Sequence, residues 1–403
     1  MGLLDGKFVV LGVSGGIAAY RACELARLLV KDGAQLQVVL TSAAAEMIGS
    51  VTFQALSGRP AEVGQGGSLA VSGMPHIDLG RDADLIIVAP ATANSLAKFA
   101  AGLADNLLSA TVLASTCPVV LAPAMNTRMW ENRITQANVS LLNQLERMIF
   151  VGPASGSLAC GEEGAGRMED PVFLLEAVRA VLSKNDLEGR KVLVTAGPTR
   201  EPVDPVRSLT NRSSGKMGYA LAAAARRRGA KVVLVSGPTA LTPPWGVKLV
   251  EVETAAQMAQ AVDKNISQCN LVLMAAAVAD FKPKTRAKQK IKKGRALGVI
   301  ELSRTKDILA ALGKKKKKPL LVGFAAETGD PVKAARQKLK AKRLDLMVAN
   351  DVSLPDAGFD VDTNRVHLVD GQASQELPLL SKEEVAERIL DRVVKMLPKK
   401  RKT

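Results

Sequence analysis

Short apolar runs alternate along the first half of the chain with longer segments in which apolar residues recur every three or four positions. The apolar runs lie at residues 7–13, 35–40, 85–89 and 119–122. Helical patterns reach residue 31, start again at residue 93 and close this half near residues 171–183. Strands that alternate with helices at this spacing predict a parallel, doubly wound sheet.

The same alternation restarts near residue 191, after a polar stretch at 184–189 that has the character of a linker. Predicted strands lie at residues 191–196, 231–235, 247–252, 271–276, 320–325 and 345–349. Predicted helices begin near residue 215 and then cover residues 254–267, 306–312, 331–342 and 381–397. We therefore expect two α/β domains, residues 1–188 and 189–403.

One connection between a predicted strand and a predicted helix is much longer than packing requires. It runs from Gly197 to about Ser214, whereas such connections usually need about 2–6 residues. Hydrogen-bond donors that it carries, with the lysine that follows, include Thr199, Arg200, Arg207, Asn211, Arg212, Ser213, Ser214 and Lys216. Because donors between the carboxyl end of a strand and a helix N-terminus favour negative charge, this connection predicts a site for an anionic ligand.

The net charge of +16 is unevenly distributed over the 403 residues. Residues 1–185 hold 13 lysines and arginines against 16 acidic residues, and the rest of the chain has a net charge of +19. A polyanionic small ligand, nucleic acid or solubility alone could each account for this basic half.

The composition is typical of a soluble globular protein, with 47% apolar residues. No apolar run reaches the roughly 18 residues of a membrane span, and the N-terminus lacks the pattern of a signal peptide. The four cysteines are scattered and have no metal-ligand spacing. We therefore expect a cytoplasmic protein that does not bind membranes.

Polar residues follow the carboxyl ends of the predicted strands in the first half, where doubly wound sheets bind their ligands. Glycines in GVSGGIAAY (residues 12–20) would let backbone N–H groups approach a phosphate, although such a turn can also be purely structural. The next strand ends at Thr41 and Ser42, where a fold that binds NAD would place an acidic residue, so these hydroxyls favour a phosphate or a flavin. Further polar residues after later strands are Thr92, Asn94, Ser95 and Asn126.

Eleven motifs occur in a characteristic order. Those of the first half are GGIAAYR (15–21), HIDL (76–79), APATANSLAKFAAGLADNLLS (89–109), PAMNTRMW (123–130) and GSLACGEEGAGRM (156–168). Those of the second half are TAGPTREPVDPVR (195–207), NRSSGKMGYALA (211–222), AAAVAD (275–280), KIKK (290–293), TKDIL (305–309) and GFAAET (323–328). Together they resemble the bifunctional bacterial enzymes of coenzyme A synthesis, in which phosphopantothenoylcysteine decarboxylase is fused to phosphopantothenate–cysteine ligase.

For the first domain, the resemblance implies a flavodoxin-like fold that binds FMN and decarboxylates phosphopantothenoylcysteine to 4′-phosphopantetheine. The implied FMN-binding residues are Gly15, Gly16, Thr41, Ser42, Thr92, Asn94, Ser95 and Ala124. Decarboxylation beside a thiol-bearing carbon needs an electron acceptor, and a flavin that oxidises the thiol provides one. The resemblance implies His76 as the base, Asn126 as the ligand of the substrate carboxylate and Cys160 as the proton donor.

Each of these three residues also has a structural interpretation. The chain has only two histidines, and a single histidine such as His76 is usually structural or exposed. Cys160 could be an inert buried thiol, although its glycine-rich flanks would make a poor core. Asn126 could cap a helix after Pro123, and both roles can hold at once.

For the second domain, the resemblance implies a Rossmann-like ligase that activates 4′-phosphopantothenate with CTP as an acyl-cytidylate, which cysteine then converts to the amide. Lys290 would stabilise the triphosphate, Asn211 would bind the acyl-cytidylate carbonyl and Arg207 would assist the second step. The implied CTP-binding residues are Asp280, Lys290, Lys306, Asp307, Ile308, Leu309, Phe324, Lys338 and Lys342. Lys338 and Lys342 share one helix face, which could equally be a solvated surface. Mg²⁺ is expected with the triphosphate, held mainly by phosphate oxygens rather than by a protein site.

Two alternative functions stay open from the residues alone. An oxidoreductase that uses FMN or NAD without ligase activity would leave Asn211, Arg207 and the KIKK segment unexplained. A nucleic-acid-binding protein would use the basic half, but the 3% aromatic content and the lack of a known binding module argue against it. The resemblance also implies homo-oligomers, with flavin domains as trimers and ligase domains as dimers.

Overall fold

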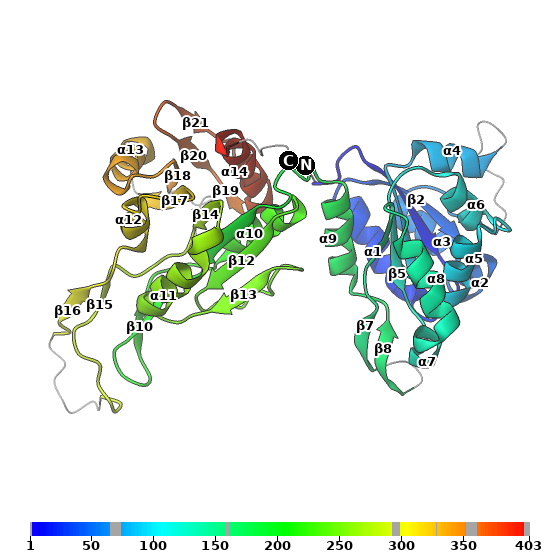
Figure 1. Cartoon of the computed structure of the whole chain (residues 1–403), viewed down its shortest axis with the longest axis horizontal. Coiled ribbons are helices and arrows are strands. Elements are labelled where there is room, and N and C mark those ends of the chain that lie inside the picture. The colour runs from blue at the N-terminus through cyan, green and yellow to red at the C-terminus, as the bar shows by residue number, and fades with distance from the viewer. Residues whose placement is uncertain are drawn as a thin grey trace. The chain divides into compact units, whose positions relative to one another are not determined.

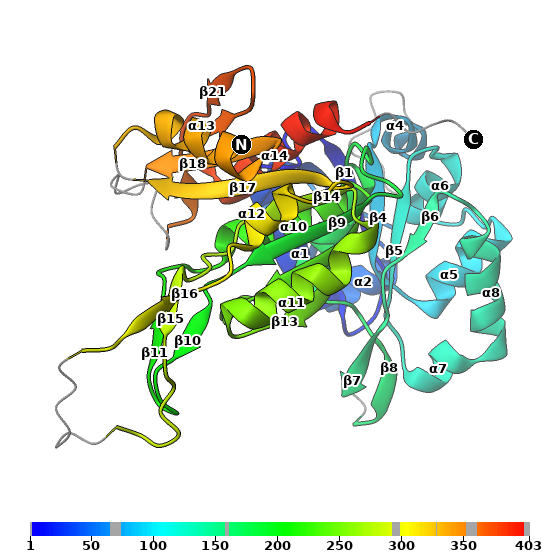
Figure 2. The ribbon, with the colours of Figure 1, turned by 60° about the vertical axis from the view of Figure 1, so that its left-hand side comes forward.

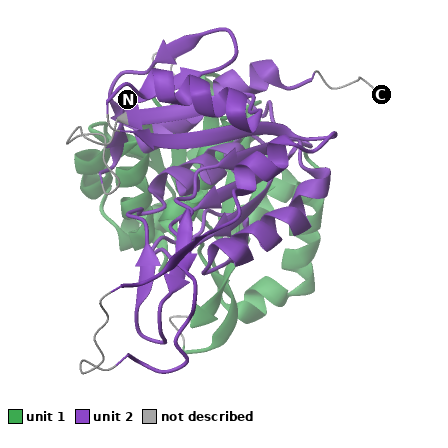
Figure 3. Ribbon diagram, turned by 90° about the vertical axis from the view of Figure 1, so that its left-hand side faces the viewer, with its two compact units in different colours: residues 1–183 green, residues 184–403 purple. Residues whose placement is uncertain are grey.

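The computed structural model describes residues 2–64, 74–157, 161–291, 299–327, 329–351 and 361–398. The chain divides into two compact units, Met1–Ser183 and Lys184–Thr403 (Figure 3). This division lies five residues before the boundary expected from the polar stretch at 184–189. Both units are doubly wound α/β structures, which confirms the expected fold class.

The first unit, coloured blue to green in Figure 1, is built on a six-stranded parallel sheet in the order β3-β2-β1-β4-β5-β6. Its strands are β1 (Phe8–Val13), β2 (Gln35–Leu40), β3 (Glu62–Val63), β4 (Leu85–Ala91), β5 (Val119–Pro123) and β6 (Met148–Phe150). Because β3 has only two residues and lies at the edge, the five longer strands follow the flavodoxin-like order. The order reverses between β1 and β4, which creates a crevice beyond their carboxyl ends.

Helices cover both faces of this sheet. One core joins it to α1 (Ala19–Lys31), α3 (Ser50–Ser57) and α9 (Pro171–Val181). The opposite core joins it to α5 (Ala93–Ala101), α6 (Leu107–Ala114) and α8 (Arg133–Asn143). The remaining helices are α2 (Ser42–Met47), α4 (Pro75–Asp82) and α7 (Thr127–Glu131). An antiparallel hairpin of β7 (Ala154–Ser157) and β8 (Glu163–Arg167) leaves the layers.

The second unit contains an eight-stranded sheet in the order β13-β12-β9-β14-β17-β18-β20-β21. Its strands are β9 (Lys191–Ala196), β12 (Lys231–Ser236), β13 (Lys248–Glu251), β14 (Leu271–Met274), β17 (Leu320–Glu327), β18 (Leu346–Asp351), β20 (Val366–Val369) and β21 (Ser374–Glu376). The first six strands are parallel and follow the order of dinucleotide-binding folds. The last two continue the sheet in antiparallel pairing.

Helices again pack on both faces of this sheet. One core contains residues of α10 (Lys216–Arg227) and α14 (Lys382–Met396). The other contains residues of α11 (Ala255–Asn265), α12 (Ile308–Gly313) and α13 (Pro331–Lys342). The short 3-10 helix η1 (Ile266–Gln268) follows α11, and β19 (Thr363–Asn364) pairs with β22 (Leu380–Ser381).

Two antiparallel hairpins extend from the second unit side by side (Figure 2). The first consists of β10 (Arg200–Pro202) and β11 (Ser208–Thr210), and the second of β15 (Phe281–Pro283) and β16 (Leu302–Arg304). The β10–β11 hairpin occupies the long connection that the sequence places between β9 and α10. It follows the carboxyl end of a central strand, where a ligand site is expected.

Among the helices in the described part of the chain, none combines the length and apolar character needed to cross a membrane.

Candidate functional site

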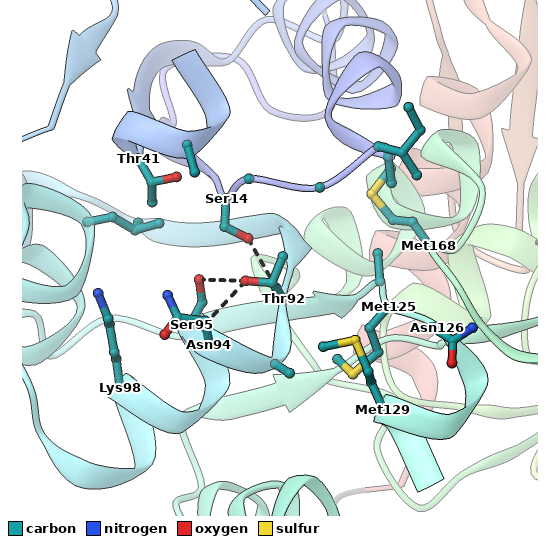
Figure 4. Close-up of a pocket in the computed structure, with 18 of the residues that line it drawn as sticks. Ser14, Thr41, Thr92, Asn94, Ser95, Lys98, Met125, Asn126, Met129 and Met168 are labelled. Carbon is teal, nitrogen blue, oxygen red and sulfur yellow. Dashed lines mark hydrogen bonds between the residues drawn. The ribbon is translucent and has the colours of Figure 1, made fainter. Parts of the chain in front are cut away.

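A cleft of about 1060 Å³ lies at the carboxyl ends of β1, β4 and β5 (Figure 4). Its volume is at the upper end of the range of about 300–1,000 Å³ that small-molecule sites occupy. All the residues expected to bind FMN line this cleft: Gly15, Gly16, Thr41, Ser42, Thr92, Asn94, Ser95 and Ala124. Asn126 lines it too, so residues from four separate segments meet at one site.

The turn after β1 reaches the cleft because Gly15 has no side chain. A Cβ atom at Gly15 would lie 2.4 Å from the Cβ of Ala43 at the start of α2, well inside contact distance. Ser14, which is 1% exposed, joins the same turn to the end of the neighbouring strand β4. Its hydroxyl donates to the carbonyl oxygen of Pro90 at 2.6 Å and accepts the N–H of Thr92 at 3.1 Å. Sequence reasoning missed Ser14, and its position between the strand and the glycines is the signal that could have revealed it.

Two threonine hydroxyls in the cleft cap helices that begin there. Thr41 accepts the N–H of Ala44 at 3.2 Å at the start of α2, and Thr92 accepts the N–H of Ser95 at 3.4 Å at the start of α5. The Thr92 and Ser95 hydroxyl oxygens lie 3.2 Å apart (Figure 4). Because a hydroxyl that accepts one hydrogen bond still has a hydrogen to donate, capping is compatible with ligand binding. The caps hold both side chains in place before a ligand arrives.

Asn126 caps a helix, as its structural interpretation predicts. Its Oδ1 accepts the N–H of Arg128 at 2.8 Å and so caps α7. The opposite end of the amide, Nδ2, donates to a carboxylate oxygen of Glu162 at 2.7 Å. Arg128 pairs with the same carboxylate at 3.2 Å. The cap therefore orients the amide so that its donor end faces an anion.

Glu162 was missed by sequence reasoning, although it stands two residues after Cys160 in the glycine-rich segment. Cys160 itself lies outside the described residues. Strand β8, which follows this segment in the sequence, approaches the loop of Asn126 very closely, since a Cβ atom at Gly166 would lie 2.2 Å from the carbonyl oxygen of Met125. The N–H of Met125 donates to the carbonyl oxygen of Gly166 at 2.9 Å. The hairpin is thus joined to the part of the cleft that contains Asn126.

His76 does not line the cleft of its own chain. It lies half-buried on α4, and α4 packs against α6. The close packing depends on Gly80, whose missing Cβ would lie 3.2 Å from the backbone at Ala114 and Ser115. The structure therefore brings Asn126 and the FMN set together but leaves His76 apart from them.

The second group of expected residues gathers at the carboxyl ends of β9 and β14. Thr199 is fully buried, and its hydroxyl accepts the N–H of Ala279 at 3.0 Å. The N–H of Thr305 donates to the carbonyl oxygen of Asp280 at 2.9 Å. Asn211 reaches the same segment, because its Nδ2 donates to the carbonyl oxygen of Val278 at 3.1 Å. Asn211 and Asp280 are therefore held at one strand end, with the Asp280 side chain exposed.

Arg207 and Lys290 come from different hairpins and are brought near one another. A guanidinium nitrogen of Arg207, Nη2, donates to the carbonyl oxygen of Ile291 at 3.0 Å. Lys290 directly precedes Ile291, and its side chain is exposed. Helix α10 follows the β10–β11 hairpin in the sequence, and its N-cap Gly215 has no side chain to cap the first-turn N–H groups.

The remaining residues expected to bind CTP divide into apolar and charged groups. Ile308 is buried, and Leu309 and Phe324 are partly buried against the cores of the second unit. Asp307 caps α12 by accepting the N–H of Ala310 at 2.9 Å, and it pairs with Lys342 at 2.9 Å. Burial raises the pKa of Asp307, but the Ala310 N–H and the Lys342 ammonium outweigh it and hold this pKa below its usual value.

The other two lysines of this set also have acidic partners. Lys338 pairs with Glu327 at 2.6 Å at the end of β17, and Lys306 pairs with Asp263 at 3.2 Å. The structure thus joins Lys342 to Asp307 but directs Lys306 toward α11. Sequence spacing showed that Lys338 and Lys342 share a helix face but could not show which acidic groups they meet.

In the described ranges, no group of three histidine, cysteine or acidic residues is placed to hold a metal ion. Burial raises the pKa of three thiols in those ranges, Cys23, Cys117 and Cys269. A raised pKa lowers the share of the reactive thiolate at neutral pH.

Comparison with known proteins gives matches over both units. The family model described as Flavoprotein matches residues 3–183, and that of the DNA/pantothenate metabolism flavoprotein C-terminal domain matches residues 187–397. The Coenzyme A biosynthesis bifunctional protein CoaBC of Bacillus subtilis (strain 168) is 48% identical over 397 residues, which is 97% of each chain. The protein of the same name from Escherichia coli (strain K12) is 47% identical over 396 residues, again 97% of each.

Among solved structures, the C-terminal domain of a Coenzyme A biosynthesis bifunctional protein CoaBC is 46% identical to this chain. It matches with a TM-score of 0.46 over 53% of this chain and 98% of that domain. The two relatives and both family models confirm the resemblance and its pair of decarboxylase and ligase activities in coenzyme A synthesis. The chain belongs to the family of bifunctional coenzyme A biosynthesis proteins.

Proposed function

We propose that the cleft of the first unit binds FMN and decarboxylates 4′-phosphopantothenoylcysteine to 4′-phosphopantetheine. The observation that carries this proposal is the convergence of eight expected FMN residues on one cleft beside Asn126. The donor set fits the cofactor, since backbone N–H groups and hydroxyls suit a phosphate, and apolar side chains of the lining such as Ile17, Leu108 and Met129 suit a flavin ring. FMN, when bound, accepts electrons from the substrate thiol and later returns a hydride.

The chain's own residues then hold the substrate and move its protons. Asn126 binds the substrate carboxylate through Nδ2, a role supported by the Glu162 carboxylate that this nitrogen already contacts. Cys160 supplies a proton to the product. Strand β7 precedes its segment in the sequence and strand β8 follows it, and β8 is joined to the loop of Asn126 by the Met125–Gly166 hydrogen bond. A cysteine-to-alanine change at position 160 should therefore stop the reduction that completes the reaction.

His76 acts as the base in the cleft of a neighbouring copy. It lies outside the cleft of its own chain, so the expected trimer of flavin domains is what would bring it to a substrate. Mixing two inactive variants, His76→Asn and Cys160→Ala, tests this idea. Co-refolded mixtures should recover decarboxylase activity if trimers combine an intact His76 with an intact Cys160, and a mixture that stays inactive would place both residues in one chain's site.

The second unit acts as the CTP-dependent ligase of the same pathway. Asn211 binds the carbonyl of the acyl-cytidylate, Lys290 stabilises the triphosphate and Arg207 assists the attack of cysteine. Asp280, Phe324 and the charged residues Lys306, Asp307, Lys338 and Lys342, with Ile308 and Leu309, form the CTP site. The proximity of Arg207 to the Lys290 segment supports this arrangement, because activation of a carboxylate by a triphosphate needs cations around several developing charges.

The co-substrate and the assembly follow from this assignment. Mg²⁺ enters with CTP on phosphate oxygens, so EDTA should stop the ligase and leave the decarboxylase unaffected. Ligase units pair as dimers, and the enzyme works in the cytoplasm, where free thiols such as that of Cys23 persist.

Two variants test the division of labour between the units. Asn211→Asp should block amide formation from cysteine while decarboxylation of supplied phosphopantothenoylcysteine continues. Cys160→Ala should show the reverse, with CTP-dependent amide formation intact and no phosphopantetheine. Product masses distinguish the two outcomes, and loss of the same step in both variants would refute the assignment.

A further inference from the structure

Asp204 is a buried carboxylate between the two extended hairpins of the second unit. Its side chain has an exposed fraction of 0%. Oδ1 accepts two backbone N–H groups of its own hairpin, from Val206 and Arg207, each at 2.8 Å. Oδ2 accepts the N–H of Ile291 at 3.2 Å, from the connection between β15 and β16. One carboxylate therefore holds two segments that are far apart in sequence.

The contact is reinforced by two further hydrogen bonds between the same segments. The N–H of Ala287 donates to the carbonyl oxygen of Val203 at 3.0 Å. Arg207 donates through Nη2 to the carbonyl oxygen of Ile291 at 3.0 Å, so both polar groups of the Ile291 backbone are engaged. Figure 2 shows the β10–β11 and β15–β16 hairpins lying next to each other.

We propose that Asp204 is a positioning residue of the ligase, which fixes the backbone of the Lys290 segment against that of Arg207. The inference rests on the proposed ligase function of this unit. The peptide that joins Lys290 to Ile291 is held by Asp204, and the backbone of Arg207 is held by the same carboxylate. The backbone at both Arg207 and Lys290 is therefore held in place, although the two side chains are long and exposed.

The carboxylate form is required for this arrangement. Hydrogen bonds from the N–H of Val206 and then from those of Ile291 and Arg207 hold the pKa of Asp204 below its usual value, against the effect of burial. An asparagine would keep one oxygen for the turn at Val206 and Arg207. Its NH₂ group would then face the N–H of Ile291, donor against donor, and that bond would be lost.

Asp204→Asn is therefore the main test, with Glu201→Gln as the matched control. Glu201 is 3% exposed in β10 of the same hairpin, and its carboxylate accepts the N–H of Ala255 at the start of α11 instead. The assay measures pyrophosphate release from CTP and 4′-phosphopantothenate in a single turnover without cysteine. We expect Asp204→Asn to slow this step about 10- to 100-fold, since displaced catalytic groups cost rates of that order. Glu201→Gln should stay within about twofold of the parent chain.

A double-mutant cycle with Lys290→Gln separates positioning from general destabilisation. If Asp204 acts through Lys290, adding Asp204→Asn to Lys290→Gln should slow the step no further than about twofold. Three results would each overturn the proposal: rate losses that multiply in the double variant, an unchanged rate of pyrophosphate release in Asp204→Asn, or a rate loss in Glu201→Gln equal to that in Asp204→Asn. If the parent chain and Glu201→Gln release no pyrophosphate at all, the ligase function fails instead.

Hydrogen exchange on the parent chain tests the same idea without relying on a variant that folds. The amide of Ile291 should exchange slowly, because Asp204 accepts its hydrogen, while exchange in Asp204→Asn should approach that of a free peptide. Fast exchange of this amide in the parent chain would refute the anchoring.

Discussion

Replacing Gly15 with alanine should separate the turn after β1 from the helix that carries the cleft hydroxyls. The added Cβ would lie 2.4 Å from the Cβ of Ala43 and 2.9 Å from its carbonyl carbon. Carbon atoms in contact normally lie about 3.5–4.0 Å apart, so a shift of about 1 Å is needed. Ala43 follows Thr41 and Ser42 directly, and the displacement therefore moves residues proposed to bind FMN.

The cost of such overpacking is about 1–3 kcal/mol. If the strain is relieved by moving the Thr41 turn, FMN binds more weakly, and the dissociation constant should rise about 5- to 150-fold. If instead the neighbouring structure absorbs it, the thermal midpoint of the ligand-free first unit falls while FMN affinity is kept.

Titration of the ligand-free protein with FMN, followed by flavin fluorescence, measures the first quantity, and calorimetry measures the second. Gly49→Ser is the control, because no atom lies within 4 Å of its added Cβ and serine is a favourable cap for α3. Gly15→Ala with an unchanged FMN affinity and an unchanged thermal midpoint would refute the argument that the turn needs glycine.

Three further predictions concern charged contacts. The Arg228 side chain is 1% exposed and pairs with Asp186 at 2.5 Å and with Asp391 at 3.0 Å. Arg228→Met should therefore lower the free energy of unfolding of the second unit by about 3 kcal/mol, measured in urea. A decrease of less than about 1 kcal/mol would contradict this. Burial raises the pKa of Asp391, but Lys184 and Arg228 outweigh it and lower this pKa overall. At acid pH the unfolded chain therefore binds more protons than the folded chain. The contribution of Asp391 to stability is full above about pH 4 and falls as the pH drops through the folded pKa. Arg228→Met should weaken that acid dependence in pH-resolved melting. Glu162→Asp keeps the charge but shortens the side chain that accepts the hydrogen bond from Asn126 Nδ2. If Glu162 competes with the substrate carboxylate for this nitrogen, KM for the substrate should fall while kcat stays constant. A raised KM would show that Glu162 supports the site instead.

The strands and helices of the two sheets could be predicted from the sequence because their burial leaves a strong pattern. The strands β2 and β9 lie at the predicted residues, 35–40 and 191–196, since both are almost wholly buried. The hairpins were not predicted. Strands β10 and β15 have three residues each, and each pairs with one short partner, β11 and β16 respectively, so they are too short to show apolar alternation.

The residues proposed to bind FMN could be predicted to meet at one site because parallel strands bring their carboxyl ends to one edge of the sheet. The positions of His76 and Lys306 could not. A helix pattern gives the face of α4 that is buried but not its distance from the cleft, and Lys306 is directed by Asp263 of a distant helix. Asp204 escaped attention for a similar reason, because its partner at Ile291 is 87 residues away.

The central claim is that one chain carries out a CTP-dependent ligation and a flavin-dependent decarboxylation. The direct measurement is product mass in a single reaction that contains 4′-phosphopantothenate, cysteine and CTP, before and after FMN is added to the ligand-free protein. We predict phosphopantothenoylcysteine before FMN, and its conversion to 4′-phosphopantetheine with release of carbon dioxide afterwards. A chain that forms no amide with CTP present, or whose amide persists unchanged once FMN is supplied, would contradict the account.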